Sequence, residues 1–364
     1  MDLTADPPCI VGAACRLPGN LAHSSALFAR FQSGDWPAAS TLPPPSRAFH
    51  LHSTPESFGR GGWLAENGVE SFDAAFFRIP PTESPTLRPN VRLALELTYD
   101  ALLHAGIPPS SLRGKNVAVA FGVGTEDGWD IRRAAMDDDH DGGKRSAFDD
   151  NWAASSDPSG VSGRVSHFFD FRGPSSVLSN ACASGGFALR DGVLSLLHDG
   201  AELAVVGALA THFSPASFLW AQASGVASSS GRCASFSPDA DGYSPSEGAV
   251  VLVLKRQSAA AEAGDAIHAR IRSVATAHNG GMRTMFTPNA HAQAQLMLRA
   301  LAAAKLTPQD IDILEAHGSG TPVGDTLELE GIRRVFHGRT RNPLLLSSAK
   351  TVLGHCHGSA FLVG

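Results

Sequence analysis

The sequence lacks the features that mark several common classes of protein. It has no dense run of lysine or arginine, and 29 basic against 35 acidic residues give a formal net charge of −6. Proteins that bind nucleic acids use such basic patches to neutralise phosphates, so we expect no nucleic-acid partner. No stretch approaches the roughly 20 apolar residues that span a membrane, and the apolar run near the N-terminus is shorter than a signal-peptide core. The sequence predicts a cytoplasmic protein without a membrane partner.

Paired cysteines are also missing. The five cysteines are Cys9, Cys15, Cys182, Cys233 and Cys356. Their odd number and the absence of a Cys-x-x-Cys pair argue against both a disulfide framework and a structural zinc site. The acidic run at residues 137–141 lacks the glycine and the spaced carboxylates of a calcium loop, and the adjacent side chains of residues 355–357 point in different directions, which makes them poor chelators. We therefore expect no bound metal.

Hydrophobic periodicity predicts an α/β protein. With 364 residues and 43% hydrophobic content, the chain can bury a large core. We expect strands at residues 9–14, 117–124, 175–179, 201–209, 249–254, 269–275, 311–315 and 344–348. We expect helices at residues 24–31, 91–105, 182–198, 290–304 and 327–336. Strands that alternate with helices indicate a sheet that is covered on both faces.

Cys182 is the strongest candidate for a catalytic residue. It lies among small residues (179–186, SNACASGG) between an apolar strand and a helical segment. A helix that begins there would direct its free backbone N–H groups at the sulfur and stabilise the thiolate. The same N–H groups can bind the oxyanion of a tetrahedral acyl intermediate. Most lone cysteines are buried core residues. Cys182 therefore predicts catalysis only if other catalytic side chains accompany it.

Two histidines further along the chain supply such partners. His317 lies in EAHGSGT at residues 315–321, and His355 ends KTVLGH at residues 350–355. Neighbouring glycines let backbone or substrate come close to each ring. Lys350 adds a cation that can bias histidine protonation. No Gly-x-Ser-x-Gly motif with a matching acid and histidine is present, which argues against a serine hydrolase. Together these residues indicate thiol-based acyl chemistry.

These residues belong to a longer series of motifs that resembles the ketosynthase domain of a polyketide synthase, most similar to fungal reducing types. The motifs cover nearly the whole chain: IVGAACRLPG at 10–19, FDAAFF at 72–77, FFDFRGPS at 168–175, FSPDADGY at 236–243, and the two histidine motifs at 315–325 and 350–355. The resemblance implies a thiolase-like layered α/β/α/β/α fold of two similar halves, usually a homodimer. Residues 1–255 would form the half with the cysteine, and residues 256–364 an incomplete half with both histidines.

The resemblance also implies a role for each candidate residue. Cys182 would take an acyl chain from the phosphopantetheine arm of an acyl carrier protein. His317 and His355 would promote decarboxylation of a malonyl thioester and bind the enolate, which attacks the acyl-cysteine in a Claisen condensation. Lys350 would orient the histidine pair, and Ser319 and Thr321 would bind the pantetheine arm. No metal and no tightly bound cofactor are implied.

The sequence departs from the family pattern at residues 84–92, at residues 244–246 and, with more consequence for the chemistry, in two further places. The usual Thr-Ala-Cys-Ser-Ser-Ser run reads NACASG at residues 180–185, a less hydroxylated turn. The sequence also stops at Gly364, before the family's closing strands and a glycine-rich loop that supplies a second oxyanion donor. Loss of one such donor costs about 10²- to 10³-fold in rate. We therefore expect either a fragment of a longer synthase or a truncated relative, and poor condensation by these 364 residues alone.

Two other functions remain open at this point. The chain could transfer acyl groups from Cys182 without condensation, or it could be a non-catalytic partner subunit that shapes a tunnel. Retention of Cys182, His317, Lys350 and His355 together argues against an idle subunit.

Overall fold

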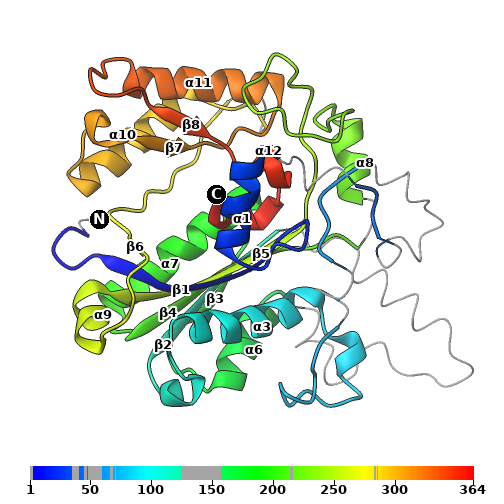
Figure 1. Ribbon diagram of the computed structural model, residues 1–364, viewed down its shortest axis with the longest axis vertical. Helices are drawn as coiled ribbons and strands as arrows, with labels where there is room; N and C mark the ends of the chain where they lie inside the picture. The colour runs from blue at the N-terminus through cyan, green and yellow to red at the C-terminus, as the bar shows by residue number, and fades with distance from the viewer. Residues whose placement is uncertain are drawn as a thin grey trace, which may run out of the picture.

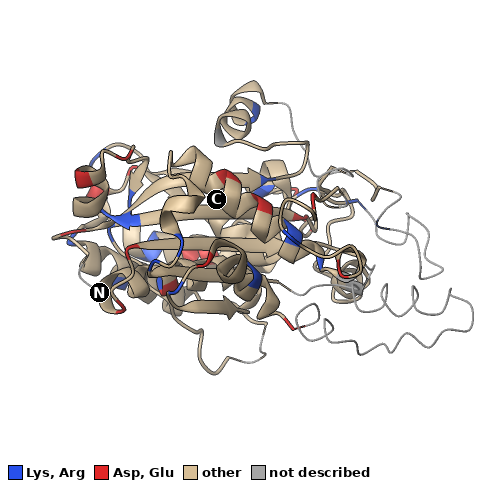
Figure 2. Ribbon diagram, turned by 90° about the horizontal axis from the view of Figure 1, so that it is seen from below, with Lys and Arg blue, Asp and Glu red and all other residues tan. Residues whose placement is uncertain are grey.

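The structure is a computed structural model that describes residues 3–34, 41–44, 47, 60–65, 69, 71–124, 157–213, 216–282, 284 and 286–364. The acidic run at residues 137–141 lies outside the described residues. Basic and acidic residues are interspersed along the described ribbon (Figure 2). None of the described helices is both long enough and apolar enough to span a membrane.

A six-stranded sheet forms the centre of the fold, with the strand order β3-β2-β4-β5-β1-β6. The strands are β1 (Pro8–Arg16), β2 (Val117–Val123), β3 (Ser175–Leu178), β4 (Leu203–Ala210), β5 (Gly248–Arg256) and β6 (Ala269–Arg270). β2 pairs in parallel with β3 and β4, whereas β5 pairs antiparallel with β4 and β1. Every residue of β2 and β4 is buried, as expected for strands that are covered on both faces.

Helices cover both faces of this sheet (Figure 1). α3 (Pro89–His104) and α6 (Gly160–Phe169) pack on one face, and α7 (Ser184–His198) packs on the other. Beyond α7 lies a second sheet of β7 (Ile313–Glu315) and β8 (Leu345–Ser347), which pair in parallel. α10 (Ala290–Ala304) and α11 (Pro322–Phe336) form the outermost layer. The predicted layered α/β fold is confirmed.

Shorter elements complete the described chain. The remaining helices are α1 (Ser24–Ser33), α8 (Ala216–Ala223), α9 (Gln257–Ala263), α12 (Lys350–Leu353) and α13 (Ala360–Val363). The 3₁₀ turns are η3 (Ser84–Thr86), η4 (Pro109–Leu112), η5 (Ala181–Ala183), η6 (Pro308–Asp310) and η7 (His357–Ser359).

Helices α6, α8, α9, α12 and α13 were not predicted. Among the predicted elements, three differ most from the structure. The helix expected at residues 182–198 begins at Ser184, because η5 precedes it. The helix expected at residues 327–336 begins at Pro322, a residue that fits the first turn because it needs no N–H there. The strand expected at residues 269–275 is only two residues long, and it pairs with β1 at the edge of the first sheet. α10 has the predicted bounds, and the Asn289 side chain caps it by accepting from the Ala292 N–H.

Glycines let α7 lie close to the central sheet. A Cβ atom on Gly192 of α7 would lie 2.3 Å from Cγ2 of Val206 in β4. A Cβ atom on Gly122 of β2 would lie 2.5 Å from the backbone carbonyl carbon of Ser184. Both distances are shorter than carbon atoms tolerate, so the sheet and the start of α7 meet only because these side chains are missing.

This packing predicts that Gly192→Ala lowers the free energy of unfolding by about 1–3 kcal/mol, because the added methyl group overpacks the interface. Gly163→Ala in α6 is the matched control, since a Cβ there meets no atom within 4 Å. It should leave the stability unchanged or raise it by roughly 0.5–1 kcal/mol through the better helix propensity of alanine. Urea unfolding of both variants provides the measurement, and equal effects would contradict the close-packing argument.

Candidate active site

Cys182 lies in η5, the sharp turn between β3 and α7. The residue before it, Ala181, has φ 50, a left-handed conformation that is costly for a residue with a Cβ atom. The buried Ser184 hydroxyl holds this turn, because it accepts a hydrogen bond from the Asn180 N–H at 2.8 Å and donates one to the Ala181 carbonyl at 2.7 Å. The sulfur is partly buried at the start of α7.

The environment of the sulfur favours the neutral thiol. Burial raises the pKa of Cys182, while the Lys350 ammonium and the backbone N–H of Cys182 lower it only in part. The sequence predicts that the helix terminus stabilises the thiolate, but burial has the larger effect on the pKa of Cys182. Cys182 therefore needs a reaction partner or a bound substrate to lose its proton.

His355 is buried, with 3% of its surface exposed. Its backbone N–H donates to the Ser244 carbonyl at 2.7 Å. Its Nδ1 atom accepts a hydrogen bond from the backbone N–H of His357 at 3.1 Å. A ring nitrogen that accepts carries no proton, so the neutral ring bears its proton on Nε2. Burial, followed by the effects of His357 and Lys350, lowers the pKa of His355 well below its usual value.

His317 follows β7 in a loop that a carboxylate organises. The Glu328 side chain accepts the backbone N–H of His317 at 2.7 Å and that of Gly318 at 2.8 Å. The His317 ring lies 5.4 Å from the His355 ring between centroids, at an interplanar angle of 82°. Part of the residue is exposed, yet the surrounding protein and the Lys350 ammonium lower the pKa of His317 to about 4. Both rings are thus neutral near pH 7.

Lys350 is the charge that these groups share. It begins α12 and is 7% exposed. Its ammonium lowers the pKa of Cys182, His317 and His355. η5, which carries Cys182, contacts η7, the turn that begins two residues after His355. The structure therefore brings the four predicted catalytic residues together from both parts of the chain.

Ser319 and Thr321 lie beside this cluster, in the loop between His317 and α11. Their hydroxyl groups form a hydrogen bond with each other at 3.0 Å, and Ser319 is 4% exposed. Both are close enough in sequence to His317 to act on the same bound molecule, and their role in binding pantetheine stays a prediction.

Two acidic residues of the first turns of α11 were missed in the sequence analysis. Asp325 accepts the backbone N–H of Phe236 at 2.7 Å and that of Gly320 at 3.1 Å. Glu328 holds the His317 loop as described above. Their spacing of three residues places both on one face of a helix, which was a usable signal. It was overlooked because the helix was expected to begin at residue 327.

Three further residues near the site were also missed. The His357 ring stacks on the His355 ring with centroids 5.1 Å apart, and the His212 ring lies 4.9 Å from that of His357. Burial raises the pKa of Tyr243 to about 12, with Cys182 as a further cause, and the Tyr243 ring lies 5.2 Å from that of His355. His357 lies two residues after His355 and Tyr243 ends the FSPDADGY motif, but only the fold shows that these rings and His212 contact one another. The side chains of residues 355–357 were expected to point in different directions, and the stacked rings of His355 and His357 correct this expectation. Among the described residues, no group of three His, Cys, Asp or Glu side chains could hold a metal ion.

Comparisons with known proteins find similar sequences over nearly the whole chain. A family model described as the N-terminal domain of β-ketoacyl synthase matches residues 6–260, and one described as the C-terminal domain matches residues 268–364. The chain is 36% identical over 365 residues to hispidin synthase of Neonothopanus nambi, with 98% of this chain and 21% of that protein covered. It is 33% identical over 383 residues to the reducing polyketide synthase AFT16-1 of Alternaria alternata, with 99% of this chain and 16% of that protein covered.

A solved structure is also similar. The oxazolomycin ketosynthase domain of Streptomyces albus JA3453 superimposes with a TM-score of 0.82 at 30% identity, covering 98% of this chain and 61% of that one. The chain thus spans about a fifth or less of the length of the curated relatives named above.

The raised pKa of Cys182 predicts that its alkylation by iodoacetamide accelerates only above the pH at which an ordinary thiol ionises, because the thiolate is the reactive form. Lys350→Met should move this pH midpoint further upward, since it removes a cation that lowers the pKa. Lys255→Met, which alters an ion pair with Asp265, serves as the control and should leave the midpoint unchanged. Rates are followed by mass spectrometry of the Cys182 peptide, and an unshifted midpoint in Lys350→Met would argue against its electrostatic role.

Proposed function

Because the chain belongs to the β-ketoacyl synthase family, we propose that it acts as the ketosynthase of a polyketide synthase. In this proposal it accepts an acyl group on Cys182 and joins it to a malonyl unit by decarboxylative Claisen condensation. Residues 1–255 supply the nucleophile and residues 256–364 supply both histidines. The observation that carries the proposal is the neutral His355 ring, whose Nδ1 accepts from the His357 N–H and whose Nε2–H can therefore donate beside His317.

The first step of the proposed reaction is acyl transfer to the cysteine. The Cys182 sulfur attacks the carbonyl carbon of an acyl thioester, a new C–S bond forms, and the bond to the carrier thiol breaks. The proton of the Cys182 thiol passes to the departing carrier thiolate. In this proposal the Cys182 backbone N–H donates to the oxyanion. Lys350, whose ammonium lowers the pKa of Cys182, stabilises the negative charge that develops at this site.

The second step generates the nucleophile from a malonyl thioester. The bond to the carboxylate breaks, CO2 leaves, and the electron pair moves onto the thioester carbonyl as an enolate. Donors that are already aligned with this oxygen stabilise the developing charge without base-catalysed proton removal. The depressed pKa values of His317 and His355 keep both rings neutral at physiological pH, which suits them as N–H donors.

The third step forms the new carbon–carbon bond. The enolate carbon attacks the carbonyl carbon of the acyl-cysteine, and the C–S bond to Cys182 breaks. The cysteine leaves as a thiolate, which the nearby Lys350 ammonium stabilises. A proton taken up from solvent water restores the resting thiol, because decarboxylation of the malonyl carboxylate releases none. The β-ketoacyl chain remains on the carrier that brought the malonyl unit.

The proposal includes the carrier and the assembly that the family resemblance implies. Acyl and malonyl groups arrive on the phosphopantetheine arm of an acyl carrier protein. The Ser319 and Thr321 hydroxyls, already paired with each other at 3.0 Å, bind this arm by exchanging their mutual hydrogen bond for bonds to its amides. Two copies of the chain associate as a homodimer.

Acylation and condensation can be measured separately. The chain is incubated with a short acyl thioester of N-acetylcysteamine, and the Cys182 peptide is analysed by mass spectrometry for the acyl adduct. Malonyl-carrier protein is then added and the carrier is analysed for a β-ketoacyl product. We expect a Cys182 adduct followed by a slowly formed extended product, and neither with Cys182→Ala. Loss of the acyl label without any extended product would instead support transfer to another acceptor, and no adduct at all would support a non-catalytic subunit.

The histidine pair predicts a second result. His317→Ala and His355→Ala should each lower malonyl decarboxylation by about 10²- to 10³-fold, because each removes one donor to the enolate oxygen. Acylation of Cys182 should persist in both variants. His278→Ala, at an exposed position, is the control and should retain the full rate. CO2 release from carboxyl-labelled malonyl thioester provides the readout, and full activity in either site variant would refute the assignment.

A further inference from the structure

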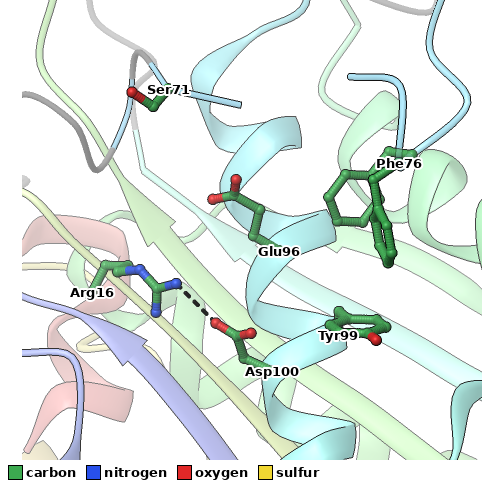
Figure 3. A pocket seen from close by; sticks show the side chains of 7 residues that line it. Arg16, Ser71, Phe76, Glu96, Tyr99 and Asp100 are labelled. Atoms are coloured by element: carbon green, nitrogen blue, oxygen red, sulfur yellow. Dashed lines mark hydrogen bonds and ion pairs between the residues drawn. The ribbon is translucent and has the colours of Figure 1, made fainter. Parts of the chain in front are cut away.

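A recess of about 300 Å³ lies on α3, on the face of the central sheet opposite to α7. Its walls come from the end of β1, from residues 71–77 and from α3 itself. None of the residues assigned to the active site lines it. Figure 3 shows the labelled side chains around this space, with the Glu96 carboxylate between Arg16 and the aromatic residues.

The recess contains one carboxyl group without a partner. Arg16 and Asp100 form an ion pair at 2.8 Å, and Arg16 also donates to the Cys15 carbonyl at 3.1 Å. Among the residues that the structure describes, the Glu96 carboxyl forms neither a hydrogen bond nor an ion pair. Burial raises the pKa of Glu96 to about 7. Once ionised, this carboxylate is a negative charge that no hydrogen bond or ion pair holds, although Arg16 and Arg92 act on it through space.

Aromatic rings form the other wall. The Phe76 ring lies 5.1 Å from the Tyr99 ring and 4.9 Å from the Phe77 ring, both at 82°. Phe76 remains 47% exposed although it is a large apolar side chain. A carboxylate beside several aromatic rings suits an organic cation, because the rings attract a cation within about 6 Å of their centroids and the carboxylate supplies the opposite charge.

A second recess of about 510 Å³ adjoins the first and shares Arg16 and Asp100 with it. Most of its exposed lining comes from apolar atoms, although Asn20, His23 and His104 also line it, and Leu103 in its wall is 52% exposed. Two neighbouring recesses of different character, one acidic and aromatic and one with a mainly apolar surface, match a polypeptide segment, which presents side chains at regular spacing. A single small cation would occupy only the first.

We propose that the Glu96 recess binds the guanidinium or ammonium group of a basic residue in a polypeptide segment that crosses α3 and places an apolar side chain against Leu103. The cation pairs with the Glu96 carboxylate and contacts the Phe76 and Tyr99 rings. This interaction surface is separate from the proposed condensation chemistry and does not depend on it.

The charged groups around Glu96 set the pH dependence of this binding. Arg16 of β1 and Arg92 of α3 favour the ionised carboxyl, and Asp100 of α3 disfavours it. Ser71 and the two phenylalanine rings that line the recess have no titratable group. Because only the ionised carboxyl attracts the ligand, affinity should rise by about tenfold between pH 6 and pH 8.

The test uses the 364-residue chain and ligand-observed saturation-transfer NMR. The probes are N-acetyl-arginine methylamide, its neutral isostere N-acetyl-citrulline methylamide, the tripeptide N-acetyl-Leu-Gly-Arg methylamide, and agmatine. We expect the arginine probe to bind at least about tenfold tighter than the citrulline probe, and the tripeptide to bind tighter than the single residue. Agmatine should bind no tighter than the arginine probe.

Variants connect the binding to the recess. Glu96→Gln should reduce the affinity for the arginine probe to that for the citrulline probe, whereas Glu262→Gln at an exposed position of α9 should leave it unchanged. Leu103→Ala should lower the affinity for the tripeptide to that for the arginine probe. The affinity for the arginine probe itself should stay unchanged. Equal binding of arginine and citrulline probes, or unchanged affinity in Glu96→Gln, would overturn the proposal. Tighter binding of agmatine than of the tripeptide would overturn its polypeptide partner.

Discussion

The candidate active site depends on one close contact, in which the first turn of α7 lies directly on β2. Gly122 makes the contact possible, since a Cβ there would lie 2.5 Å from the Ser184 backbone. Ser184 then uses its hydroxyl to hold the left-handed turn at Ala181. The position of Cys182 is therefore fixed by packing and hydrogen bonds that lie beneath it. A strained backbone conformation beside a nucleophile persists only when the surrounding contacts hold it in place.

Burial and a single cation then set the protonation of the groups around the sulfur. Desolvation favours the neutral form of every group here, so it raises the pKa of Cys182 and lowers those of His317 and His355. The Lys350 ammonium lowers the pKa of Cys182 and so counteracts the effect of burial on the thiol. It also lowers the pKa of His317 and His355, and there it acts in the same direction as burial. One ammonium can thus stabilise a transient thiolate while it keeps two imidazoles neutral, which is the combination that acyl transfer followed by decarboxylation requires.

The sequence predicted the parts of this arrangement that lie in local patterns. Cys182, His317 and His355 stand beside glycines near apolar strands, Lys350 precedes His355 by five residues, and the helix at residues 290–304 has a continuous apolar period. The spacing of Glu328 placed it on a helix face but did not show that it holds the His317 loop. The contact of the His212 ring with His357 joins segments that are far apart in the sequence, so no local pattern indicated it. β6 was overestimated because its apolar pattern continues beyond the two residues that find a pairing partner on β1. Whether burial or the helix terminus has the larger effect on the pKa of Cys182 also could not be predicted, because the burial of the sulfur is known only from the structure.

The central claim is that His355 is a neutral ring with its proton on Nε2, ready to donate to a developing enolate. Nitrogen-15 NMR of histidine-labelled protein, with His355 assigned by comparison with His355→Asn, measures this directly. We expect a protonated Nε2, an unprotonated Nδ1 and a pKa of His355 well below that of an ordinary histidine. A proton on Nδ1, or a pKa of His355 at or above that of an ordinary histidine, would contradict this claim.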